Sequence, residues 1–261
     1  MFMHIKNYRI FYEEKGSGPA IIFFHGFGGN HVVWSEQIGF FTHHGYQTIT
    51  FDQPGHGETT GDYPQSIRNL IDCSRELIAK LNISRPILIG HSMGCSVIWG
   101  LMKYYPDLSI KAAITIDQSP KMLNDSQWPY GFLDLNNDNY QNTIIENRHV
   151  KETLYGLDNR VWQKLAPFKQ KFPFNRNKNI ALMLDHVQKD WRKIVYKIDI
   201  PYLHIASKKS PYFNLGYVNL IRKENSNIKI KIVSNVGHDA MAEKPDEFNR
   251  YVNSFLLKIK E

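Results

Sequence analysis

The chain has 261 residues, of which 42% are hydrophobic and 22% charged, so it can bury a core and lacks the composition of a disordered protein. Its formal net charge is +7, but the 32 basic residues are scattered and form no nucleic-acid motif, so we expect no nucleic-acid partner. No apolar run approaches the roughly 18–20 residues of a membrane span, and the first residues do not resemble a signal peptide, so we expect a cytoplasmic protein without stable membrane insertion.

The first half of the chain alternates between predicted strands and helices. In chain order we expect a strand at 4–13, a strand at 20–24, a helix at 32–44, a strand at 46–51, a helix at 66–81, a strand at 86–89, a helix beginning at 95 and a strand at 110–116. Continuous apolar runs such as 20–24 are typical of strands that are buried on both faces.

The pattern changes after residue 118. Residues 119–179 contain many aromatic side chains and no clear buried strand, which predicts an inserted helical cap. The remaining core is expected to comprise residues 1–118 and 180–261. After the insertion we expect a helix at 180–198, a strand at 200–205, a helix at 212–223, a strand at 228–233 and a closing helix at 245–259.

This alternation predicts an α/β fold with a mostly parallel sheet and helices on both faces. Polar residues follow five of the predicted strands: His25, Asp52, Ser92, Asp117 and His238. Because reactive groups in such sheets gather at the carboxyl ends of the strands, we expect these side chains at one edge.

The segment Gly90-His91-Ser92-Met93-Gly94 has the pattern G-x-S-x-G between a predicted strand and a predicted helix. In this setting a sharp turn exposes the serine hydroxyl as a nucleophile, and the flanking glycines allow the strained backbone without clashing Cβ atoms. The alternative interpretation is an ordinary strand-to-helix turn with Ser92 as a helix cap. The strand before and the helix after it favour the first interpretation.

With these segments the sequence resembles the α/β-hydrolase fold superfamily, and within it the cap-bearing serine esterases and haloperoxidase-like members. The resemblance covers nearly the whole chain and implies an eight-stranded sheet. It rests on His25-Gly26-Phe27-Gly28, Asp52-Gln53-Pro54-Gly55-His56-Gly57, Gly90–Gly94, and Gly237-His238 followed by Glu243, Pro245 and Phe248. These motifs specify the fold much more closely than the substrate.

The resemblance implies a role for individual residues. Ser92 matches the nucleophile and His238 the general base. The backbone N–H groups of Phe27 and Met93 match the two oxyanion donors, which bind the negative oxygen of a tetrahedral intermediate.

The triad acid departs from the commoner family pattern. In the matching segment, 203–210, a serine stands where a carboxylate is expected. Asp117, at the end of the strand 110–116, is the best replacement, because some members of the superfamily place the acid there. Alternatively, Asp117 caps a turn while water or Ser210 orients His238. The cap carboxylates Asp125 and Asp134 are weaker candidates.

The other histidines and the two cysteines do not predict a metal site. No H-x-x-x-H pair with a nearby acid is present, and Cys73 and Cys95 belong to no metal or redox spacing. We therefore expect no metal and no cofactor. In the family a histidine at the position of His25 hydrogen-bonds the loop backbone, and we expect Asp52 to brace that loop or its own turn.

Aromatic residues of the insertion have two interpretations. Trp128, Tyr130 and Phe132 form the core of a small lid, or they line an apolar substrate pocket over Ser92. Trp34 faces either the core or this pocket.

Together these features predict a monomeric or homodimeric serine hydrolase that cleaves a small to medium ester with an apolar portion through an acyl-enzyme. Cleavage of a thioester, lactone or carbon–carbon bond by the same triad remains an alternative. A small-molecule sensor that signals to a protein partner is the alternative from another class. Rapid turnover of simple esters would favour the enzyme.

Overall fold

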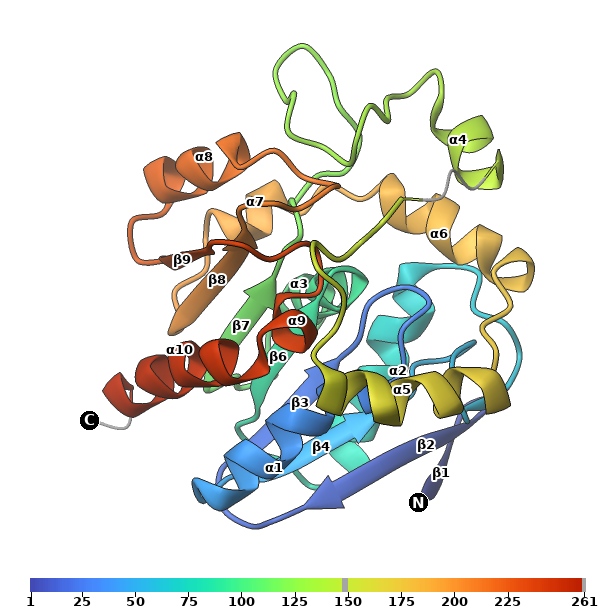
Figure 1. Ribbon diagram of the computed structural model, residues 1–261, viewed down its shortest axis with the longest axis vertical. Coiled ribbons are helices and arrows are strands. Elements are labelled where there is room, and N and C mark those ends of the chain that lie inside the picture. Colours follow the sequence, from blue (N-terminus) through green and yellow to red (C-terminus); the bar gives the residue numbers. More distant parts are fainter. Residues whose placement is uncertain (147–149, 260–261) are drawn as a thin grey trace.

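The computed structural model describes residues 1–146 and 150–259. Its centre is a twisted sheet that carries helices on both faces (Figure 1). The strands follow one another in the order β1-β2-β4-β3-β6-β7-β8-β9, and a short strand, β5, pairs with β2. The predicted α/β fold class is therefore confirmed.

The strands are short and, in the centre of the sheet, buried on both faces. They are β1 (Phe2–Ile5), β2 (Tyr8–Lys15), β3 (Ala20–Phe24), β4 (Gln47–Phe51), β5 (Thr60–Gly61), β6 (Ile87–His91), β7 (Ala112–Ile116), β8 (Tyr202–Ser207) and β9 (Lys229–Val233). From β4 through β9 neighbouring strands pair in parallel, whereas β2 pairs antiparallel with β1, β4 and β5.

The single strand expected at 4–13 is instead a hairpin of β1 and β2. Lys6 has a left-handed backbone with a φ of 50°, and Ile5 pairs directly with Tyr8 across the turn. Alternation of side chains continues on both sides of this turn, so the pattern did not mark the reversal.

The helices surround the sheet in two layers. They are η1 (His31–Trp34), α1 (Ser35–His43), α2 (Ile67–Lys80), α3 (Met93–Tyr104), α4 (Tyr140–Glu146), α5 (Asn159–Lys171), η2 (Asn177–Asn179), α6 (Ile180–Val187), α7 (Arg192–Val195), α8 (Gly216–Glu224), α9 (Ala240–Glu243) and α10 (Pro245–Lys258). Successive side chains of β3 point to opposite faces: Ile22 packs with residues of α2 and α3, and Phe23 with residues of α1 and α10.

The helix expected at 180–198 is broken into α6 and α7. Between them the Trp191 N–H donates to the Pro120 carbonyl, and the Asp190 carboxylate accepts from the Arg192 N–H. These bonds replace the helical ones, so tertiary contacts override a continuous helical pattern.

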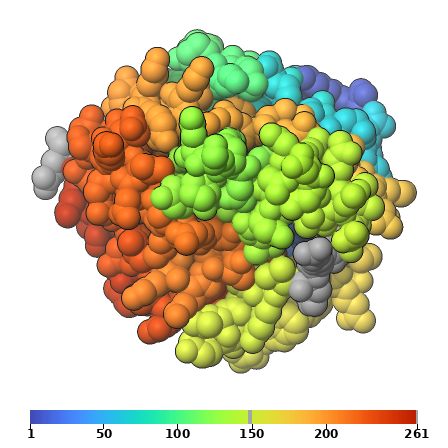
Figure 2. All heavy atoms as spheres, turned by 90° about the horizontal axis from the view of Figure 1, so that it is seen from above, coloured from blue at the N-terminus to red at the C-terminus, as the bar shows by residue number. Residues whose placement is uncertain are grey.

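Residues between β7 and β8 include α4 to α7 and build a third apolar cluster of their own, which contains Leu135, Ile144 and Val187. We propose that 119–179 acts as a cap over the rest of the chain. Figure 2 looks down on this end of the molecule, where the green to yellow segments lie beside the orange residues that follow β8. Of the helices that the structure describes, none is long and apolar enough to cross a membrane.

The packing of α3 on β3 predicts opposite effects of alanine at two helical glycines. A Cβ atom on Gly94 would lie 2.2 Å from the Phe24 carbonyl oxygen, whereas one on Gly39 would meet nothing within 4 Å. We expect Gly94→Ala to lower the free energy of unfolding by about 1–3 kcal/mol through overpacking. Gly39→Ala, the control, should raise it by about 0.5–1 kcal/mol because alanine favours the helix. Urea unfolding followed by circular dichroism measures both, and a Gly94→Ala protein as stable as wild type would contradict the prediction.

Candidate active site

Ser92 lies in the sharp turn between β6 and α3. Its backbone has φ 52° and ψ −120°, a strained conformation for a residue with a side chain. The flanking glycines prevent Cβ clashes, as expected, although neither has a left-handed backbone itself. A Cβ on Gly90 would lie 2.7 Å from the Gly94 carbonyl, so glycine gives the room in which the helix approaches the strands.

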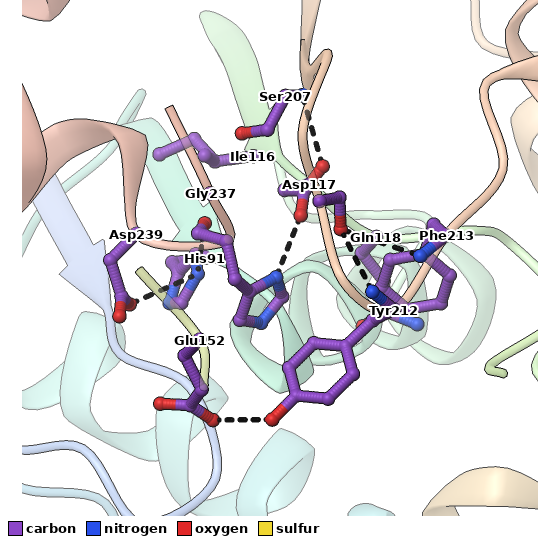
Figure 3. Close-up of polar contacts among 12 residues, drawn as sticks. His91, Ile116, Asp117, Gln118, Glu152, Ser207, Tyr212, Phe213, Gly237 and Asp239 are labelled. Carbon is purple, nitrogen blue, oxygen red and sulfur yellow. Dashed lines mark hydrogen bonds and ion pairs between the residues drawn. The ribbon is translucent and has the colours of Figure 1, made fainter. Parts of the chain in front are cut away.

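Asp117 and His238 form a buried pair at the same edge of the sheet. Asp117 directly follows β7, is 1% exposed, and has a φ of 47°. His238 Nδ1 donates to Asp117 Oδ2 at 2.7 Å, and the Ser207 N–H donates to Asp117 Oδ1 at 3.0 Å (Figure 3). Since a carboxylate only accepts, Nδ1 carries the proton and Nε2 is left to act as an acceptor.

The surroundings of His238 set its proton affinity. Burial disfavours the imidazolium, but the hydrogen bond and charge of Asp117, with the charges of Asp239 and Glu152, more than offset this. The pKa of His238 is consequently raised above its ordinary value. This arrangement favours a histidine that accepts a proton next to a fixed carboxylate.

Ser92 and His238 line the same cavity. No hydrogen bond joins their side chains among the bonds of the described residues. Hydrogen bonds of this kind are often long without substrate and tighten in the complex. The structure thus brings the three expected triad residues to one edge and bonds two of them.

The other candidates for orienting His238 lie elsewhere. The Asp125 carboxylate pairs with Lys121 and is 42% exposed, and Asp134 is exposed. Ser210 Oγ accepts from the N–H groups of Tyr212 and Phe213. Asp117 holds the Nδ1 position of His238.

Two buried histidines hold the glycine loop 26–29. The Gly28 N–H donates to His56 Nε2 at 3.1 Å, so His56 Nδ1 carries the proton and donates to the Pro54 carbonyl. His25 is held alike: Nε2 accepts from the Gln53 N–H, and Nδ1 donates to the Gly26 carbonyl at 2.8 Å. Burial lowers the pKa of His56 to about 3, which keeps it neutral.

The rest of this loop is arranged around Phe27. The Gly29 N–H donates to the Gly26 carbonyl, and Phe27 lines the cavity beside Ser92. Among the loop hydrogen bonds of the described residues none uses the Phe27 N–H, as expected for a donor kept for a ligand. Met93, whose N–H begins α3, has its side chain buried in the core.

Asp52 braces both segments that the sequence suggested. Its carboxylate accepts from the His31 N–H at 2.7 Å, at the end of the glycine loop, and from the Glu58 N–H at 2.8 Å, in its own turn. Burial alone would raise the pKa of Asp52, but the hydrogen bond and charge of His31 outweigh it and the pKa is lowered.

The cavity has a volume of about 210 Å³. Its walls combine apolar side chains with a few charged ones, and they include Phe27, Val33, Ser92, Phe132, Leu157, Leu165, Met183, His238, Glu152, Asp239, Lys169 and Arg176. Such a mixture suits a small ligand with an apolar portion and a few polar groups.

Of the four aromatic residues expected in the pocket, only Phe132 lines it. Trp34 is fully buried against Phe23, with ring centroids 5.1 Å apart. Trp128 is 1% exposed and donates from Nε1 to the Lys121 carbonyl, and Tyr130 packs edge-on against it. These three side chains therefore belong to apolar cores and not to the substrate pocket, because their rings pack against other side chains away from Ser92.

Sequence reasoning missed two groups beside His238, Tyr212 and Glu152. The Tyr212 ring lies edge-on to the imidazole at 4.8 Å, and its hydroxyl donates to Glu152 Oε1 at 2.8 Å (Figure 3). His91 Nε2 lies 3.6 Å from Asp239 Oδ1. Neither Tyr212 nor Glu152 belongs to a motif. The signal in the sequence that could have indicated Tyr212 as a site residue was the aromatic pair Tyr212-Phe213, shortly after the end of β8.

Glu243 fastens the loop that carries His238. Its two carboxylate oxygens accept from the N–H groups of Gly237 and Leu154, both at 2.8 Å. The His238 N–H donates to the Glu152 carbonyl at 2.7 Å. Among the described residues no group of three or more His, Cys, Asp or Glu side chains is arranged to hold a metal ion.

The bond between His56 and Gly28 predicts the behaviour of a shape-conserving variant. His56→Phe keeps a ring to stack on Phe174, which lies 4.7 Å away, but removes the acceptor for the Gly28 N–H. We expect faster amide hydrogen exchange at Gly28 and a loss of about 1 kcal/mol in unfolding free energy, because a half-buried donor is left unpaired. His44→Phe is the control, since His44 Nδ1 bonds an exposed helix carbonyl instead. Equal exchange rates at Gly28 in both variants would contradict the role of His56.

Comparison with known proteins agrees with this geometry. A family model of the α/β-hydrolase fold matches residues 19–245. The chain is 26% identical over 255 residues to "Putative esterase/lipase 2" of Mycoplasma genitalium, covering 96% of this chain and 93% of that protein.

Solved structures share the fold at low sequence identity. An esterase of Exiguobacterium antarcticum superposes with a TM-score of 0.84 at 17% identity, covering 100% of this chain and 99% of the other. A bromoperoxidase of Bacillus anthracis gives 0.81 at 20% identity, with 95% of each chain covered. With the strand order, the serine turn and the family match over most of its length, the chain belongs to the α/β-hydrolase fold family.

Proposed function

We propose that the protein is a serine hydrolase that cleaves small to medium carboxylic esters with an apolar portion. The observation that carries this proposal is the 2.7 Å bond from Asp117 to His238, which lines the same cavity as Ser92. The likeness to a protein named as an esterase/lipase over nearly its whole length supports the same chemistry.

In this mechanism His238 Nε2 takes the proton of the Ser92 hydroxyl as Oγ attacks the ester carbonyl. The negative oxygen of the tetrahedral intermediate rests on the N–H groups of Phe27 and Met93; such a donor typically contributes about 10²–10³ in rate. The imidazolium then protonates the leaving alcohol, and an acyl-enzyme on Ser92 remains.

Water completes the cycle on the same groups. His238 removes a proton from water as the oxygen attacks the acyl carbonyl, and it returns that proton to Ser92 Oγ as the acid leaves. Asp117 holds the Nδ1 proton of His238 in place and stabilises the imidazolium that forms twice. The apolar walls at Val33, Leu157 and Met183 accommodate the apolar portion of the ester.

The nucleophile is tested by Ser92→Ala. We expect loss of labelling by a fluorophosphonate probe and a fall of about 10⁶-fold in turnover of a p-nitrophenyl ester, since no other hydroxyl lies at the strained turn. Ser96→Ala, one turn further along the same helix and buried, is the matched control and should label normally. Labelling that survives in Ser92→Ala would refute the assignment.

The acid is tested by the pH dependence of Asp117→Asn. Hydrolysis requires neutral His238, so kcat/KM of the wild type should fall as the pH drops through the His238 pKa, which lies above its ordinary value. Without the Asp117 charge, burial dominates and this acid limb should move to lower pH, while kcat falls by on the order of 10⁴-fold. Asp125→Asn, at an exposed rival carboxylate, should leave both unchanged. An unshifted limb in Asp117→Asn would place the acid elsewhere.

Turnover on a panel of esters, thioesters and lactones sorts the remaining chemistry. Rapid turnover of short esters is the expected outcome. Slow turnover of every member, together with ligand-induced cap movement, would instead favour a sensor.

A further inference from the structure

Arg176 is a half-buried cation in the cavity wall without an acidic partner among the described residues. Its Nη2 donates to the Ile144 carbonyl at 2.6 Å, while its buried Nε has no partner. A guanidinium carries five N–H donors, and burial of an uncompensated charge is costly. Arg176 thus has donors free for an anion.

The Arg176 guanidinium lies beside the glycine loop 26–29. Its Cζ lies 5.6 Å from the centre of the Phe27 ring, and Phe174, two residues earlier, packs edge-on against that ring at 5.0 Å. Burial lowers the pKa of Arg176 against the opposing effect of Tyr212, the residue that contacts His238. Arg176 therefore faces the cavity between the loop and the histidine side.

The acidic groups of the cavity do not neutralise Arg176. The Glu152 carboxylate accepts a hydrogen bond from the Tyr212 hydroxyl, and Asp239 Oδ1 lies 3.6 Å from His91 Nε2. A second cation, the exposed Lys169 on α5, also lines the cavity, and burial raises the pKa of Asp239 despite the opposing charges of His238 and Lys169. The cavity wall thus holds two carboxylates near His238, of which Glu152 comes from the insertion, and neither forms an ion pair with Arg176 among the described residues.

We propose that the natural ester carries a carboxylate, which Arg176 binds and Lys169 attracts more weakly. This inference rests on the proposed ester hydrolysis and adds a substrate class to it. The planar fork of arginine matches both oxygens of a carboxylate, and its free donors are preorganised in the cavity wall. The volume of about 210 Å³ limits the ester to a short chain between its reacting carbonyl and its charge.

The kinetic test compares two isosteric substrates. One is mono-p-nitrophenyl adipate, and the other is the neutral ester in which an isopropyl group replaces the free carboxylate. For Arg176→Gln we expect the ratio of kcat/KM, anionic over neutral, to fall by about 10- to 100-fold, mainly through KM. A purely structural Arg176 would lower both values alike, and this result would overturn the proposal.

Two lysines of α5 provide graded controls. Lys169→Gln should lower the same ratio by about 2- to 5-fold, because an exposed charge is screened by solvent. Lys171→Gln, on the same helix but outside the cavity wall and against Phe172, should leave it unchanged. An equal effect of both lysine variants would indicate general surface charge rather than a site.

A binding measurement separates this inference from the proposed hydrolysis. Calorimetric titration of wild type should show tighter binding of adipate than of hexanoate, which has the same chain length and one carboxylate, and Arg176→Gln should remove the difference. If no ester is cleaved but this difference is found, the hydrolase proposal fails and the anion site stands. If adipate and hexanoate bind alike, or neither binds, the anion site is overturned whatever the esters show.

Discussion

The hydrogen bond between His238 Nδ1 and Asp117 Oδ2 ties together the parts of the chain on which the site depends. Asp117 follows β7, His238 follows β9, and the Ser207 N–H at the end of β8 holds the second carboxylate oxygen. Because the carboxyl ends of parallel neighbours lie at one edge, a single buried carboxylate reaches both later strands. The two residues are 121 positions apart in the sequence, yet they lie side by side at the edge of the sheet.

Close approach of backbone to backbone is the second constraint on the same edge. A Cβ on Gly26 would lie 3.1 Å from both Ser92 Cβ and His91 Nδ1, and one on Gly237 would lie 2.3 Å from the Glu152 carbonyl. Side chains at these positions would push apart the glycine loop, the serine turn and the histidine loop. Strain is concentrated instead at Ser92 and Asp117, both with a left-handed backbone.

Charged groups of both signs line the cavity. The carboxylates of Asp117, Asp239 and Glu152 raise the pKa of His238, whereas Arg176 has no acidic partner among the described residues. Phe174 links the insertion to the glycine loop, because it stacks on His56, which holds Gly28, and packs on Phe27. The insertion therefore contributes to the shape of the glycine loop as well as to the charge of the cavity.

Local pattern was sufficient for the central strands and the serine turn, whereas the resemblance to the family suggested Asp117, which the structure bonds to His238. Short apolar runs such as 20–24 and 86–89 are typical of buried parallel strands. The motifs around Ser92 and His238 each lie within a short stretch of sequence. Local pattern could not predict the break between α6 and α7. There the Trp191 N–H bonds the distant Pro120 carbonyl, and the Asp190 carboxylate accepts from the Arg192 N–H at the start of α7.

Tertiary structure alone decided which side chains face the cavity. The aromatic side chains of Trp34, Trp128 and Tyr130 are of a type common in pockets, but they pack in apolar cores. Arg176, Glu152 and Tyr212 line the cavity although their segments contain no motif. A sequence states which residues are apolar or charged and at what period. Which way an irregular segment turns depends on contacts with residues far along the chain, and for Arg176 that contact is with the Ile144 carbonyl and the Phe27 ring.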